Sequence, residues 1–173
     1  DNPMALWIRE FDPALAPAAQ IHTARFDAAL ALVRAGYEDL IGLRDKLSPG
    51  THLLFHAYDF AIPDGRGICH LGPWLKPTFD LRGFPTRASA RCLCQPLTMN
   101  ALAVVKEMLK RFAVLLDGLA AANSKVTFLN GQGTLPESTT AWHNELHPAK
   151  AGFEKFAGLF HQVLKELFPG RVL

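Results

Sequence analysis

The chain has 173 residues, of which 49% are hydrophobic and 20% charged, and its formal net charge is +2. This length suits one domain with a substantial core. The near-neutral charge does not indicate a nucleic-acid or anionic-membrane partner, and no apolar segment is long enough to span a membrane. The sequence therefore predicts a single globular domain over residues 1–173.

The N-terminal third is expected to be helical. Asn2 and Pro3 are typical of a helix start, and the apolar residues up to Phe11 should pack against the rest of the chain. A long amphipathic helix is predicted from about Gln20 to Leu47, where Ser48-Pro49-Gly50 ends it. Its expected buried face comprises Phe26, Leu30, Val33, Tyr37, Leu40 and Ile41.

A first strand is predicted within residues 51–60. Leu53-Leu54-Phe55 is a short continuous apolar run after a turn signal, which favours a strand buried on both faces. His56, Tyr58 and Asp59 follow at its C-terminal end. In an open α/β sheet, ligands bind at that edge.

Residues 61–97 are rich in proline and glycine, which leaves no room for a long element, yet their aromatic and leucine side chains argue against disorder. We expect a long ordered loop with a short strand near residues 91–94. Such a loop serves either as a lid or binding wall, or as a packing or oligomer contact. The three cysteines, Cys69, Cys92 and Cys94, favour reduced thiols in a reducing compartment such as the cytoplasm, with a bridge from Cys69 left open.

A second helix is predicted from Thr98 to about Asn123, followed by a strand within residues 125–130. This order indicates a βαβ unit and a parallel sheet. Two strands cannot cover three long helices, because the sheet edges stay unpaired and the apolar faces are too small. Either further strands exist, or another polypeptide segment supplies part of the sheet.

The stretch from Trp142 to Pro148 carries the strongest candidate for chemistry. Pro148 suits the first position of a helix whose apolar face runs from Phe153 to Leu167. His147 then lies at the helix entrance, a good position for a general base, although many histidines there only close a helix.

Several motifs together resemble the C-terminal blocks of SGNH (GDSL-type) esterases and lipases. They are Gly133-Thr134-Leu135-Pro136, Trp142-x-Asn144-Glu145-Leu146-His147-Pro148 with Gly152-Phe153, and His56-x-Tyr58-Asp59 with Gly72-Pro73-Trp74-Leu75. The resemblance implies a three-layer α/β/α sandwich with a flavodoxin-like parallel sheet, incomplete in this chain. It implies a bacterial-type hydrolase that acts on small carboxylic esters without a cofactor.

The resemblance also assigns roles to residues. His147 is the catalytic base, and Asn144 stands where the family has the orienting Asp. Asp59 or Glu145 would then supply the missing charge, with Tyr58 as a further supporting residue. The Gly-Asp-Ser nucleophile block and the oxyanion blocks are absent, so we expect the C-terminal part of a longer hydrolase. Its partner would be the N-terminal part of the same protein or a second copy of the chain.

Alternative functions remain at this stage. None of Ser48, Ser89, Ser124 and Ser138 has the flanking glycines of a nucleophile turn. A zinc site at His143 and His147 is disfavoured because Glu145 does not directly follow the first histidine. Gly131-Gln132-Gly133 only weakly suggests a dinucleotide loop. A non-catalytic, hydrolase-derived module that binds a partner is the main alternative to an enzyme.

Overall fold

The computed structural model describes residues 3–85 and 98–172 and shows a mixed α/β fold. In chain order, the elements are η1 (Pro3–Leu6), η2 (Pro17–Gln20), α1 (Thr23–Leu47), β1 (Leu53–His56), α2 (Lys76–Leu81), α3 (Thr98–Ala122), β2 (Val126–Leu129), η3 (Thr139–Ala141) and α4 (Lys150–Leu167). The η elements are short 3-10 helices.

Within the described residues, the sheet consists of two parallel strands. Leu53 to His56 of β1 pair in register with Val126 to Leu129 of β2, and α3 makes the crossover between them. A dozen or more residues are needed to connect parallel strands, and α3 supplies them. The predicted βαβ unit is therefore confirmed.

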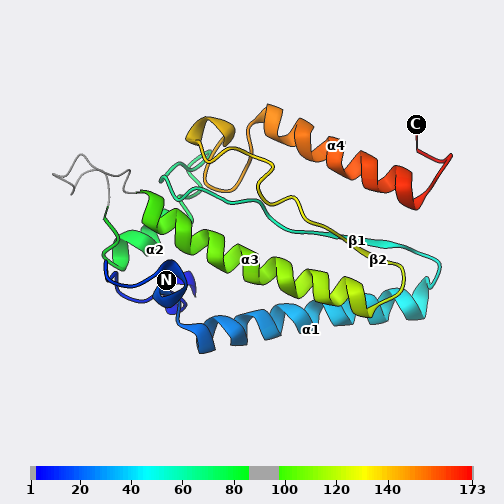
Figure 1. Cartoon of the computed structure of the whole chain (residues 1–173), viewed down its shortest axis with the longest axis horizontal. Helices are drawn as coiled ribbons and strands as arrows, with labels where there is room; N and C mark the ends of the chain where they lie inside the picture. Colours follow the sequence, from blue (N-terminus) through cyan, green and yellow to red (C-terminus); the bar gives the residue numbers. More distant parts are fainter. Residues whose placement is uncertain (1–2, 86–97, 173) are drawn as a thin grey trace.

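Helices cover both faces of this small sheet (Figure 1). On one face, the Phe55 ring packs edge-on against Tyr37 of α1, with centroids 4.7 Å apart. On the other, the His56 ring packs edge-on against Phe160 of α4, at 5.4 Å. Since successive strand side chains point to opposite faces, these contacts place α1 and α4 on opposite sides of β1.

The core has two apolar clusters. The first joins the N-terminal segment, α2 and the start of α3, and includes Ile8, Ile21 and Phe79. The second joins α1, α3 and the sheet through Ile41, Phe55 and Leu116. The expectation that the N-terminal apolar residues pack against the domain is confirmed for Ile8, which is fully buried, whereas Leu6 is exposed.

Several predicted features differ in the structure. β1 is not buried on both faces, because only Phe55 is buried and His56 is exposed. On α1, Val33 and Leu40 lie outside the buried face. The described part of the long loop contains one short helix, α2, and the strand expected near residues 91–94 lies outside the described residues.

The start of the last helix also differs. Pro148 does not begin it, because α4 starts at Lys150 with Ala149 as its N-cap. Pro148 instead forms an isolated antiparallel bridge with Trp142, and the Ala149 N–H donates to the Ala141 carbonyl oxygen. This extended pairing holds residues 148 and 149 out of the helix, so His147 lies three residues before it.

Candidate functional site

The His147 loop is closed by backbone pairing at its base. Beyond the bridge between Trp142 and Pro148, the His143 N–H donates to the His147 carbonyl oxygen at 2.8 Å. The loop therefore forms a tight turn next to the N-terminus of α4. Within it Asn144 and Glu145 are fully buried, while His147 is exposed.

Asn144 fixes the His147 ring through a single oxygen atom. The Asn144 Oδ1 accepts hydrogen bonds from the backbone N–H groups of Leu146 at 2.8 Å and His147 at 2.9 Å. The Nδ1 of His147 lies 3.0 Å from the same oxygen. Because the two backbone donors identify this atom as the oxygen, Nδ1 carries the proton and donates, which leaves Nε2 as an acceptor.

Glu145 binds a different part of the molecule. Its Oε1 accepts from the N–H groups of Gly65 and Lys76, both at 2.9 Å. Its Oε2 accepts from the N–H groups of Trp74 at 2.6 Å and Leu75 at 2.8 Å. All four donors belong to the segment before and at the start of α2. Glu145 therefore fastens this segment to the His147 loop.

The fastened segment contributes an aromatic neighbour to the candidate base. The indole ring of Trp74 packs edge-on against the His147 ring, with centroids 6.3 Å apart. Arg66 adds a second connection, because its guanidinium pairs with Asp64 and donates to the carbonyl oxygens of Trp142 and Thr139. The segment that follows β1 thus forms one wall beside His147.

Asp59 and Tyr58 lie at the C-terminal end of β1. The Asp59 carboxylate is buried and accepts from the N–H groups of Phe60, Gly133 and Leu135, which ties the loop after β2 to the end of β1. Burial raises the pKa of Tyr58 to about 12, so its hydroxyl stays neutral at physiological pH. The Tyr58 ring lies against that of Trp142, at a centroid distance of 6.2 Å.

The sequence-predicted residues therefore separate into two groups. His147 and Asn144 form a hydrogen-bonded pair, whereas no hydrogen bond or ion pair in the described part of the chain links Asp59, Glu145 or Tyr58 to the His147 ring. The two carboxylates instead bind backbone N–H groups. The sequence reasoning missed Arg66, which belongs to no motif, and it quoted Trp74 only within the Gly72-Pro73-Trp74-Leu75 motif, without predicting its contact with His147.

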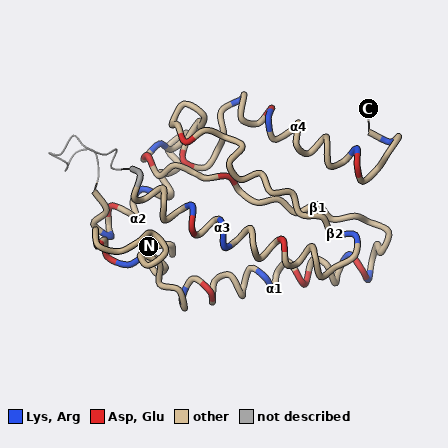
Figure 2. Tube along the Cα trace, viewed as in Figure 1, with Lys and Arg blue, Asp and Glu red and all other residues tan. Residues whose placement is uncertain are grey.

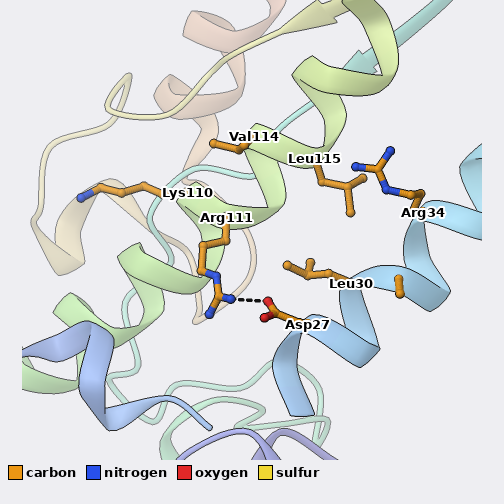
Figure 3. A pocket seen from close by; sticks show the side chains of 8 residues that line it. Asp27, Leu30, Arg34, Lys110, Arg111, Val114 and Leu115 are labelled. Carbon is orange, nitrogen blue, oxygen red and sulfur yellow. Dashed lines mark hydrogen bonds and ion pairs between the residues drawn. The ribbon is translucent and has the colours of Figure 1, made fainter. Parts of the chain in front are cut away.

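Away from the His147 loop, a hollow lies between α1 and α3 (Figure 3). It measures about 440 Å³ and is lined by Leu30, Val114 and Leu115 with charged neighbours, among them Arg111, which pairs with Asp27. Figure 2 shows that Lys and Arg alternate with Asp and Glu along the helices, with no extended region of one sign. This hollow includes no residue of the His147 loop.

Two expectations concern metals and membranes. Over residues 3–85 and 98–172, no three His, Cys, Asp or Glu side chains are grouped so that they could hold a metal ion. No described helix combines the length and apolar character needed to cross a membrane.

Comparisons with protein-family models, with curated proteins and with solved structures found no match to this chain.

Proposed function

We propose that this chain carries the base-bearing part of an acyl-transfer site, like that of SGNH-type carboxylic ester hydrolases. His147 is the general base and Asn144 its orienting residue. A serine nucleophile and the oxyanion donors come from another polypeptide segment. The Nδ1 to Oδ1 contact of 3.0 Å between His147 and Asn144 carries this proposal, because it leaves Nε2 of this exposed residue able to accept a proton.

In the proposed reaction, the serine oxygen attacks the ester carbonyl carbon while Nε2 of His147 takes the serine proton. The same nitrogen then returns that proton to the leaving alkoxide, and water hydrolyses the acyl-enzyme by the same steps. Asn144 can orient the imidazole but cannot stabilise the imidazolium by charge. In serine proteases, the change from Asp to Asn costs about 10⁴ in rate, so we expect a slow enzyme.

The incomplete sheet supports the need for a second segment. The Leu53 and Ala57 N–H groups donate to the Lys125 and Leu129 carbonyl oxygens, so those of Leu54 and His56, which alternate with them, point to the outer edge of β1, where no described strand pairs. On α4, the apolar face is only half-buried, and Phe153 is 53% exposed. Additional strands beside β1 would cover both surfaces and complete a three-layer α/β/α sandwich.

The same observations favour one alternative function. A chain with uncovered apolar surfaces and no charged orienter for its histidine would also suit a non-catalytic module that binds a partner. The partner is then the remaining part of the same protein or a second copy of the chain. Activity measurements on the assembled protein separate this alternative from the enzyme.

The decisive experiment is ester hydrolysis by the polypeptide encoded by the whole reading frame. We expect p-nitrophenyl butyrate to be hydrolysed and His147→Ala to reduce kcat/KM by at least about 10³. His143→Ala is the matched control, because this exposed histidine lies four residues earlier and should retain activity within about twofold. Equal activity of both variants would refute His147 as the base, and stable assembly without hydrolysis would favour the binding module.

A further inference from the structure

An open groove of about 560 Å³ lies between α3 and β2. It is distinct from the hollow between α1 and α3, because no residue of α1 lines it. Its lining residues belong to α3, to β2 and to the loop that follows β2. They are Lys110, Ala113, Val114, Asp117, Phe128, Asn130 and Gln132. The groove therefore lies between a helix and a strand whose outer edge has no strand partner among the described residues.

The backbone at the outer edge of β2 can pair with one more strand. The Lys125 and Leu129 carbonyl oxygens accept hydrogen bonds from β1 at 2.8 and 3.2 Å. Since successive residues of a strand direct their N–H and C=O groups to opposite sides, those of Val126 and Phe128 point to the outer edge, where no described strand pairs. Such an edge is a template for the addition of a strand from another chain.

The α3 side of the groove carries one charge of each sign. Lys110 and Asp117 are both exposed and line the groove. They are seven residues apart, which places them on the same side of the helix and about 10 Å apart along it. Asp117 has no ion pair within the described ranges, and Lys110 pairs only with Glu107 of its own helix. Because an exposed pair of this kind contributes little, both charges are available to a partner.

This pattern of charges is complementary to itself. Two identical strands that pair antiparallel are related by a two-fold axis, so each contact of residue i with residue j occurs twice. With the axis midway between Lys110 and Asp117, Lys110 of each copy faces the partner's Asp117. Ala113 and Val114 lie at this midpoint and line the same groove as Phe128. A second copy of the chain therefore matches both charges at once.

The spacing of the helices is compatible with this arrangement. α3 packs over both strands, since its Leu116 shares an apolar cluster with Phe55 of β1 and Val126 of β2. Adjacent strands are about 4.8 Å apart, so helices centred over the strand pair of each copy lie about 10 Å from one another. Packed helices have axes about 8–10 Å apart. The two copies of α3 can thus contact each other across the axis and close the groove.

We propose that two copies of this chain associate through the outer edges of β2, which pair antiparallel, with Lys110 of each copy facing the partner's Asp117. The two small sheets then form one continuous sheet with both α3 helices on the same face. This interface uses neither the His147 loop nor the outer edge of β1, where the proposed function requires additional strands. It therefore goes beyond the proposed reaction and does not depend on hydrolysis.

Charge reversal tests the contact across the axis. Sedimentation equilibrium should show a reversible monomer–dimer equilibrium. Lys110→Glu places like charges at both symmetry-related contacts, so we expect the dimer Kd to rise about tenfold, and Asp117→Lys should act likewise. The two substitutions together restore opposite charges and should return the Kd to within about threefold of its original value. Lys155→Glu is the matched control, because this exposed lysine lies on α4, and it should leave the Kd within about twofold.

Amide hydrogen exchange identifies the edge that pairs. The Phe128 N–H should exchange at least about tenfold more slowly above the dimer Kd than well below it, whereas exchange of the Leu54 N–H should not depend on concentration. A chain that stays monomeric, a combined variant no tighter than the single ones, or protection of Leu54 in place of Phe128 would overturn the proposal. Protection of Phe128 that is independent of concentration would assign the edge to the same polypeptide and would also overturn it. A dimer without esterase activity would support the interface and count only against the hydrolase.

Discussion

Two neighbouring polar side chains, Asn144 and Glu145, are fully buried and have different roles. Asn144 holds His147, but its Nδ2 group is buried without a partner in the described chain. Glu145 has both oxygens saturated by backbone N–H groups. The first role was implied by the resemblance of the motifs around His147, which placed Asn144 at the position of an orienting residue. The sequence could not predict the second, because backbone donors leave no pattern in the residue types.

Glu145→Gln tests the role of the buried carboxylate. The glutamine NH₂ group would face two backbone N–H donors that now bind an oxygen, so we expect the free energy of unfolding to fall by about 2–4 kcal/mol. Glu154→Gln is the control, since this exposed side chain lies 3.9 Å from Lys150 and should cost less than about 1 kcal/mol. Urea denaturation measures both. Similar small losses would mean that the four N–H groups find water or other partners.

At the scale of elements, the helices were the best predicted parts of the chain. The helix predicted from Thr98 to about Asn123 is confirmed as α3, whose Leu102, Val105 and Leu116 are buried. Helical periodicity identifies an apolar face, but it does not reveal whether another element covers that face. This explains why Val33 and Leu40 of α1 were wrongly placed in the core. The predicted start of α4 was wrong for another reason. Pro148 pairs with Trp142 and so stays outside the helix, and the helical pattern of the sequence does not reveal this pairing.

On α1, the large exposed side chains form a stripe of their own. Leu32, Leu40, Leu43 and Leu47 are 45% to 76% exposed and, at about 100° per residue, lie within about 80° of one another. The α1 residues that line the groove toward α3, among them Asp27 and Arg34, lie on the opposite side of the helix (Figure 3). The exposed stripe thus faces away from α3 and is available to cover additional strands.

A pair of substitutions on α1 tests this interpretation. Leu40→Gln with Leu43→Gln should change the free energy of unfolding of the isolated chain by less than about 0.5 kcal/mol per site, because both leucines are largely exposed. Ile41→Ala, at a residue 4% exposed, should cost about 2–4 kcal/mol. Size-exclusion chromatography should show that the double variant no longer assembles with the rest of the protein. Unimpaired assembly would mean that the stripe is not the contact.

For the molecule as a whole, the central question is whether two strands make a finished sheet. The helices α1 and α4 have 25 and 18 residues, whereas each strand has four, and the outer edge of β1 has no strand partner among the described residues. The shortage of strands was apparent from the sequence, since three long helices outnumbered two strong strand signals. What the sequence could not reveal was the order of the sheet, in which the outer edges of both β1 and β2 lack a strand partner among the described residues.

Amide hydrogen exchange tests the open edge directly. In the isolated chain, the N–H groups of Leu53 and Ala57 donate to Lys125 and Leu129 at 2.8 and 3.2 Å, whereas those of Leu54 and His56 point to the free edge. We expect the second pair to exchange about 100-fold faster, which at 1.4 kcal/mol per tenfold corresponds to about 2.8 kcal/mol. In the assembled protein, a new parallel strand should slow the exchange of Leu54 and His56 to the rate of their neighbours. Uniformly slow exchange along β1 in the isolated chain would contradict an open edge, because it would require partners for these amides within the chain itself.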